Sequence, residues 1–234
     1  MSNYYCTNSG VENENQQESC GCEQSGGGAP IHGCCCPCAE DFRKALGLLC
    51  SPRLQPLVDF AAFSFITDNY VLGTAIADTS AVPVSAAPSD NLTDPAARFT
   101  CGGDSCESLT VSGTLYPAVA ASAPLTTSVT QAALCQLDAI TFDASDIDEG
   151  AAANFQTLSQ RLGQCLRPQK PQECTSVAEA LTSAAAVRAS TITAGPLVVE
   201  NSTIIGQLGN VLVMANAASN RFYLICANKV GVIG

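Results

Sequence analysis

The sequence predicts an α+β domain of mainly antiparallel strands, with an N-terminal helix and a helical hairpin. Three observations support this class: strand-like alternation in both halves of the chain, separate segments of helical periodicity, and turn residues between short strands. The domain should span residues 39–234. Residues 1–38 are polar and Gly-rich, and we expect a flexible arm because they lack the apolar residues that a core requires.

The domain is expected to begin with a helix over residues 39–50. Its apolar positions follow the spacing of one helical face: Phe42, Ala45, Leu46, Leu49 and Cys50. Glu40 and Asp41 lie in the first turn, where the helix dipole favours acids. Ser51 and Pro52 should end this helix and could start a short second one.

Strand-like sequence follows. Residues 60–67 and 70–77 are rich in aromatic and β-branched residues and could form a hairpin through Asp68 and Asn69. Three prolines within residues 78–100 predict a long loop.

The clearest strand spans residues 109–115, where apolar residues alternate with hydroxyls. One or two more strands are expected within residues 126–142. Their phase slips between Ala139 and Ile140, which indicates a bulge or a strand end.

Residues 150–189 predict the helical hairpin, because two apolar stripes at helical spacing flank Arg167-Pro168. Ser176 and Glu179 form a capping box for its second helix. The remainder is strand-like again, over residues 197–205, 207–215, 222–227 and 230–233. Turns are expected at Gly206, at Gly209-Asn210 and at Asn228.

The composition favours a protein that is covered by copies of itself. Hydrophobic residues make up 47% of the chain and charged residues 13%, about half the usual share. A chain with so little surface charge has few means of staying monomeric. With a net charge of −11 and no basic patch, we expect no nucleic-acid partner, and no apolar run is long enough to span a membrane.

Fourteen cysteines suggest an oxidising destination, yet the N-terminus has neither the basic nor the apolar region of a secretory signal. Three explanations are open. The cysteines bind metal, they are catalytic, or the chain assembles inside a cell and is oxidised after that cell lyses.

Consecutive cysteines at 34–36 are poor partners for one another, because adjacent Cα atoms lie about 3.8 Å apart, closer than a relaxed disulfide spans. We therefore expect the arm to form disulfides with other chains. The candidates for these intermolecular bonds are Cys6, Cys20, Cys22, Cys34, Cys35, Cys36 and Cys38.

Within the domain, Cys101 and Cys106 could close a small loop, and Cys165 and Cys174 flank the turn of the helical hairpin. These four are the candidates for intrachain disulfides, although spacing does not determine connectivity. Cys135 and Cys226 lie in strand patterns and are expected to be core residues.

Two alternatives use the same cysteines. Cys20, Cys22, Cys35, Cys38 and His32 could gather around Zn²⁺ or Cu⁺, although only one CxxC pair is present. Cys35-Cys36-Pro37-Cys38 before a helix is similar to the CxPC motif of thioredoxin-like oxidoreductases, but no strand precedes it. With a single histidine, a Ser-His-Asp or HExxH site is excluded.

The Cys20-Gly21-Cys22 and Cys34–Cys38 clusters, set in an arm before a domain, resemble the cysteine-rich structural proteins of endospore outer layers. These are the exosporium and coat proteins of Clostridium and Bacillus relatives, which build two-dimensional lattices. The plan is also similar to that of spore-appendage subunits. The resemblance implies synthesis in the mother-cell cytosol, a place at the spore surface, disulfide-linked assembly with itself and other spore-surface proteins, and neither catalysis nor a cofactor.

Overall fold

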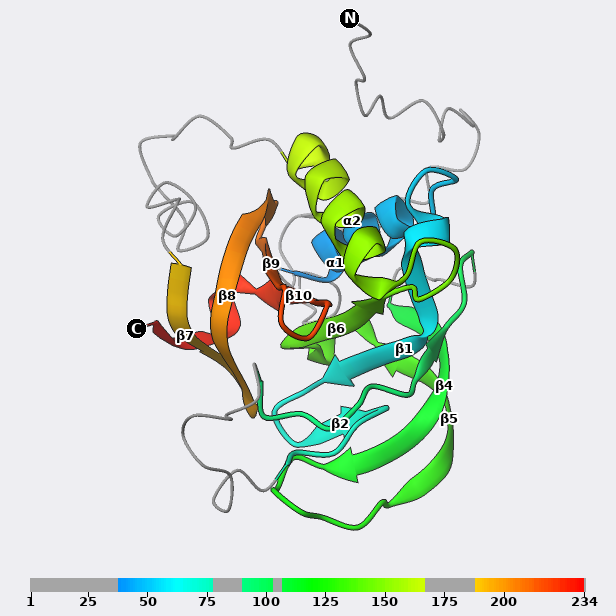
Figure 1. Ribbon diagram of the computed structural model, residues 1–234. Coiled ribbons are helices and arrows are strands. Elements are labelled where there is room, and N and C mark those ends of the chain that lie inside the picture. The colour runs from blue at the N-terminus through cyan, green and yellow to red at the C-terminus, as the bar shows by residue number, and fades with distance from the viewer. Residues whose placement is uncertain (1–37, 78–89, 103–106, 167–187, 234) are drawn as a thin grey trace, which may run out of the picture.

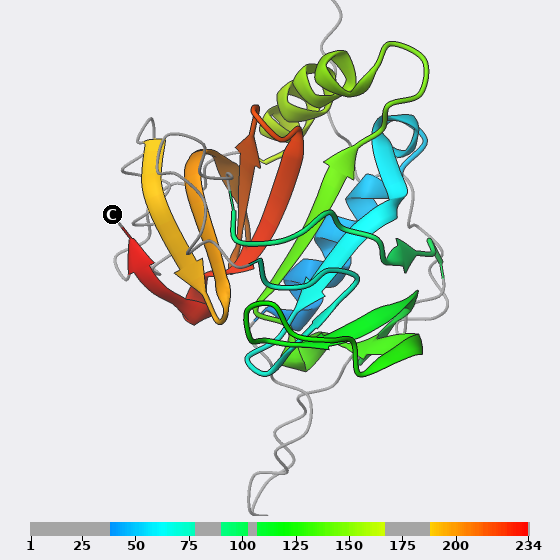
Figure 2. The same cartoon turned by 60° about the horizontal axis from the view of Figure 1, so that its bottom comes forward.

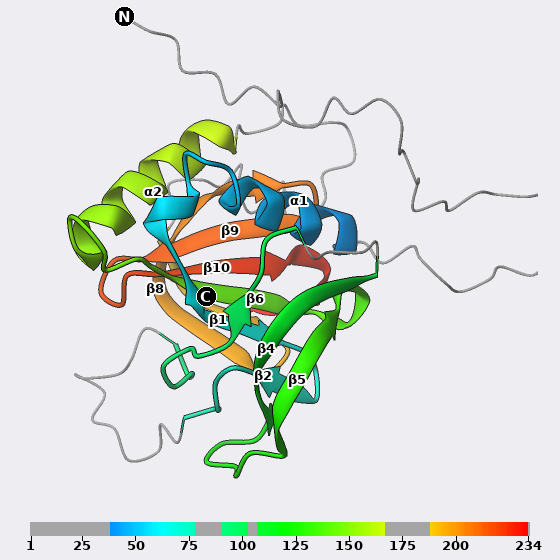
Figure 3. The same ribbon diagram turned by 90° about the vertical axis from the view of Figure 1, so that its right-hand side faces the viewer.

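One large antiparallel sheet organises the chain in the computed structural model, which describes residues 38–77, 90–102, 107–166 and 188–233. The 11-stranded sheet has the order β11-β7-β8-β9-β10-β6-β1-β2-β4-β3, and β5 pairs with the other edge of β4. Two α-helices lie on one face (Figures 1 and 3). The predicted α+β class is therefore confirmed.

The strands vary from two to twelve residues. Their bounds are β1 Val58–Ile66, β2 Tyr70–Leu72, β3 Arg98–Phe99, β4 Ser108–Pro117, β5 Thr126–Ala133, β6 Ala139–Ala144, β7 Arg188–Ala194, β8 Leu197–Leu208, β9 Val211–Asn216, β10 Arg221–Cys226 and β11 Val230–Ile233. Short 3₁₀-helices occupy Gln55–Leu57, Leu134–Gln136 and Ala227–Lys229. The predicted hairpin at Asp68-Asn69 is present, because β1 and β2 pair antiparallel around it.

Helices α1, Ala39–Leu49, and α2, Ala151–Cys165, bury the apolar stripes that their periodicity predicted. In α1 the side chains of Phe42, Leu46 and Leu49 are almost completely buried. In α2 Leu158 and Leu162 face the sheet in the same way. The second helix of the predicted hairpin lies at positions outside the described residues.

One predicted turn is wrong, because Gly206 lies inside the long strand β8. A Cβ atom at this position would come within 2.8 Å of the Leu166 Cβ, so the glycine allows the end of α2 to approach the strand. The predicted turn at Gly209-Asn210 does separate β8 from β9.

The core has two parts, one on each face of the sheet. The larger part lies under the helices and contains a row of phenylalanine rings in contact, including Phe63, Phe142 and Phe222, with centroids 5.2–5.4 Å apart. Residues 90–99 run from β8, where Asp90 bridges Val199, to β4, where Phe99 pairs with Val111 (Figure 2). The start of this crossing segment packs on the second core through Leu92, and its end contributes Ala97 and Phe99 to the larger core.

Candidate functional site

Helix α1 is fixed to the sheet by a disulfide at each end. Cys38, at its N-terminus, is bonded to Cys226 at the end of β10, with their Cα atoms 5.6 Å apart. Cys50, directly after the helix, is bonded to Cys101, which follows β3, with a Cα–Cα distance of 5.8 Å. Since an α-helix rises about 1.5 Å per residue, the two bonds anchor α1 at points about 18 Å apart.

These pairings differ from the expected ones. Cys38 forms an intrachain disulfide instead of the predicted intermolecular bond. Cys101 is in an intrachain disulfide, as expected, but its partner is Cys50 and not Cys106. Cys226 is a buried core residue, as expected, and Cys135 is partly buried against the core, but both are disulfide-bonded and not free thiols.

The remaining cysteine predictions are not tested. Cys165 is disulfide-bonded, and its proposed partner Cys174 lies outside the described residues. The other six arm candidates also lie outside them: Cys6, Cys20, Cys22, Cys34, Cys35 and Cys36.

The Cys38–Cys226 bond weakens both alternatives for the arm. A zinc or copper site needs thiolate ligands, whereas the Cys38 sulfur is bonded to Cys226 and the residue is only 3% exposed. A CxPC oxidoreductase would pair Cys38 with Cys35 and keep an accessible sulfur. In the part of the chain that the structure describes, no group of three or more His, Cys, Asp or Glu residues could hold a metal ion.

Helix α1 also supports the turn between β8 and β9. The Asp41 carboxylate accepts a 2.7 Å hydrogen bond from the backbone N–H of Asn210. Gly209 adopts a positive φ of 56°, and a Cβ there would collide with the same carboxylate. Asp41 therefore does more than the predicted interaction with the helix dipole, because it joins the helix to a distant turn.

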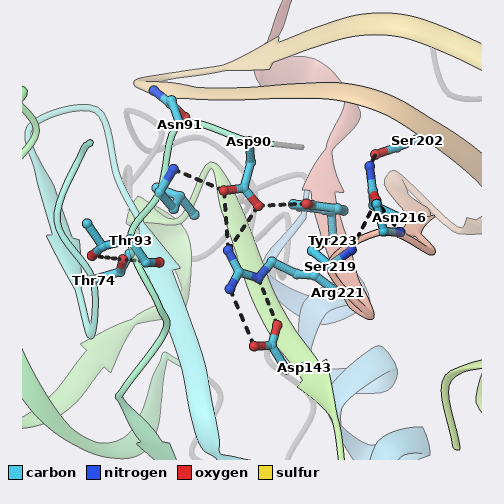
Figure 4. A network of polar contacts seen from close by, with 12 residues as sticks. Thr74, Asp90, Asn91, Thr93, Asp143, Ser202, Asn216, Ser219, Arg221 and Tyr223 are labelled. Atoms are coloured by element: carbon cyan, nitrogen blue, oxygen red, sulfur yellow. Dashed lines mark hydrogen bonds and ion pairs between the residues drawn. The ribbon is translucent and has the colours of Figure 1, made fainter. Parts of the chain in front are cut away.

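A buried charge network lies on the second face of the sheet, and Figure 4 shows its members converging from three segments. Arg221 on β10 donates through Nε to Asp143 on β6 at 2.7 Å, and through Nη1 to Asp90 at 3.0 and 3.2 Å. The Tyr223 hydroxyl donates to Asp90 at 2.6 Å. Asp90 also accepts from the backbone N–H of Leu92 at 3.0 Å, so the network holds the crossing segment in place.

Burial has opposing effects on the ionised groups of this network. It raises the pKa of Asp143 above its ordinary value, although Arg221 opposes the shift. Burial also disfavours the charged form of Arg221. The hydrogen bond to Asp143 and the charge of Asp90 outweigh this effect, so the pKa of Arg221 is raised. Arg221 therefore stays charged and its two carboxylate partners satisfy it.

Sequence reasoning did not find this network. Arg221 begins the apolar segment RFYLIC, and a buried arginine requires an acidic partner. That signal predicts a carboxylate partner but does not identify it, because Asp90 is 131 positions away.

A second ion cluster lies at the start of β6. Asp138 is completely buried, and Lys229 Nζ lies 2.9 Å from its Oδ1 and 3.1 Å from Asp68 Oδ2. Lys229 and Asp138 are close enough for an ion pair, but their geometry does not meet the criteria for a hydrogen bond. Burial raises the pKa of Asp138, and the contacts with Asp138 and then Asp68 raise that of Lys229.

Among the helices that the structure describes, none combines the length and apolar character needed to cross a membrane. The predicted intermolecular partners of the chain are not tested by the fold.

Comparison with known proteins gives a consistent result. The family model described as "Spore coat protein CotA-like" matches residues 34–234. The chain is 24% identical over 263 residues to the spore coat protein CotA of Clostridioides difficile (strain 630), an alignment that covers 85% of this chain and 83% of that protein. No solved structure matches the chain. The match from residue 34 to the last residue includes the cysteine run and the whole described domain, and this chain therefore belongs to the CotA-like family of spore coat proteins.

Proposed function

We propose that this protein is a structural building block of the spore outer layer, coat or exosporium, which assembles with its own copies into a disulfide-cross-linked lattice or fibre. The family match and the disulfides support the structural role. On this proposal the chain is made in the mother-cell cytosol, joins the spore surface, and acts without catalysis.

The Cys38–Cys226 bond is the observation that carries the cross-linking part of the proposal. Cys34, Cys35 and Cys36 precede Cys38 by two to four positions. A fully extended chain spans at most about 3.6 Å per residue, so their Cα atoms stay within about 14 Å of that of Cys38. The cysteine run is thus held close to the point where the chain is covalently attached to a central strand of the sheet.

This attachment suits a cross-linking site. A disulfide from one of these three cysteines to a neighbouring subunit would connect two folded sheets through a few residues. Holding reactive thiols near a neighbour raises their effective concentration, so weak non-covalent contacts can set the geometry before oxidation makes it permanent.

The test is electron microscopy and denaturing electrophoresis of the purified, oxidised full-length protein. We expect ordered sheets or fibres that resist boiling in detergent alone and dissolve on boiling in detergent with reductant. Replacing Cys34, Cys35 and Cys36 together by Ser should leave the domain folded and abolish the resistance to detergent. Cys38 is kept in this variant because its bond is intrachain.

The matched control is the double variant Cys50→Ser/Cys101→Ser, which also removes cysteines but from a bond within one chain. It should lower the stability of the domain and keep the detergent-resistant assemblies. A wild-type protein that stays monomeric would overturn the proposal. If the triple variant resists detergent as well as the wild type does, the cross-links must be formed by other cysteines.

A further inference from the structure

The strand β5 forms one end of the sheet, and no other described strand pairs with its outer edge. Among the described residues it pairs with β4 only. Six of its eight residues are exposed, and the other two, Val129 and Ala132, are half-buried against the core. Leu125, directly before it, is 56% exposed. Such an edge offers a row of backbone donors and acceptors to another strand.

The backbone groups that point outward follow from the ladder. Leu134 N–H donates to the Glu107 carbonyl, and the register pairs Leu109 with Ala132. Because bonded and non-bonded pairs alternate in an antiparallel ladder, Gln131 and Ala133 direct their N–H and C=O groups away from β4. The N–H of Thr100 donates to the Thr110 carbonyl, which shows that Thr110, opposite Gln131, points away from β5.

The usual protection of an edge strand is missing here. Natural edge strands carry lysine or other charges, or proline, to prevent pairing with other chains. From Ser108 to Leu137 the sequence has no Asp, Glu, Lys, Arg or His, and β5 itself has no proline. The two register shifts lie between Thr110 and Leu115, which leaves the ladder regular at the end that contains Gln131.

The distribution of charge favours a second copy of this chain as the partner of β5. The chain carries a net charge of −11, so two copies repel each other over most of their surfaces. A surface without charge is where that repulsion is least. The strand at the other end of the sheet, β11, has four residues and follows Lys229, so it offers a shorter and charged edge. At the regular end of β5, residues 129–133 can lie beside the same five residues of a second copy when a two-fold axis passes close to Gln131.

We propose that β5 pairs antiparallel with β5 of a second copy of this chain, about a two-fold axis close to Gln131, and that the two sheets become continuous. The inference rests on the proposed self-assembly and names its non-covalent contact. A two-fold contact by itself ends at a dimer. Cross-links through the arm would then join dimers, so the two contacts together can extend a lattice.

The test measures assembly of the full chain in reductant, by light scattering and electron microscopy, so that only non-covalent contacts count. It is made under conditions where circular dichroism shows that the wild-type domain stays folded without its disulfides. Gln131→Pro removes an outward N–H and spares the bonds to β4. Gln131→Lys places like charges opposite each other across the axis. Each should reduce assembly at equal concentration by up to about fivefold. Gln156→Lys, the same change on the exposed face of α2, should leave assembly unchanged.

Circular dichroism and thermal melting check that the variants fold, and Thr130→Lys on the same strand replaces any that do not. Wild-type assembly in reductant together with full assembly of the β5 variants would overturn this contact while leaving the proposed function in place. Loss of assembly in Val232→Lys on β11, without loss in Gln131→Lys, would also overturn it. A folded wild-type chain that assembles only without reductant would overturn this contact alone, and one that assembles under neither condition would overturn both.

Discussion

The disulfide between Cys38 and Cys226 should be a large contribution to the stability of the domain. The perturbation is the double variant Cys38→Ala/Cys226→Ala, with alanine chosen because both sites are buried and apolar. The bond closes a loop of sequence separation 188. The loop-entropy relation gives about 5 kcal/mol for a loop of that length. The Cys50–Cys101 bond shortens the free loop, but this changes the estimate by only about 0.3 kcal/mol.

The assay is guanidinium unfolding of the oxidised proteins, followed by far-UV circular dichroism. A single domain is typically stable by about 5–15 kcal/mol, so the variant should lose a third or more of its free energy of unfolding. The control is Cys50→Ala/Cys101→Ala, whose separation of 51 gives about 4 kcal/mol. A loss below about 1 kcal/mol for the Cys38–Cys226 pair, with an unchanged slope, would refute the assignment of this bond to the native fold.

Two further predictions concern the buried charges. Burial raises the pKa of Asp138 above the ordinary value of 3.8. Between pH 3.8 and the raised pKa, the folded protein binds more protons than the unfolded chain, so its stability falls as the pH rises through this window. In thermal melts from pH 3 to 8, the melting temperature of Asp138→Asn should fall less with rising pH than that of the wild type. The control Asp68→Asn, which removes a carboxylate whose pKa is lowered by Lys229, should keep the wild-type fall. Equal profiles for the wild type and Asp138→Asn would contradict this prediction. Arg221→Met should cost about 3–5 kcal/mol, because it leaves two carboxylates without their cation. Tyr223→Phe removes only one hydrogen-bond donor to Asp90 and should cost about 1–3 kcal/mol. Urea unfolding in which Tyr223→Phe costs more than Arg221→Met would refute the conclusion that Arg221 is the main contact of this network.

The elements with a local signature could be predicted from the sequence. Helix α1 and the β1–β2 hairpin follow from periodicity and from a turn at fixed positions, and both are present. Gly206 was misleading because glycine marks close packing as well as turns. The two-residue strand β3 has no pattern of its own and exists only because β4 lies beside it.

The candidate site was harder to predict because its contacts join distant positions. Cys226 was recognised as buried, but nothing in its surroundings identifies Cys38 as its partner, since connectivity depends on the folded topology. Asp90 was part of a predicted loop, and its role depends on Arg221, which lies far along the chain. The family resemblance, which came from the cysteine clusters, was confirmed by the match to the CotA-like family.

The double attachment of α1 also determines where mechanical load would enter the protein. A pull on the chain before Cys38 passes through a covalent bond to Cys226, at the end of β10. This strand is hydrogen-bonded along both edges, to β9 and to β6, so the load must shear two ladders before the sheet yields. The helix and its connections lie outside this path, and Cys50–Cys101 limits how far they could extend. A layer built from such units would transmit tension from sheet to sheet without unravelling the domains.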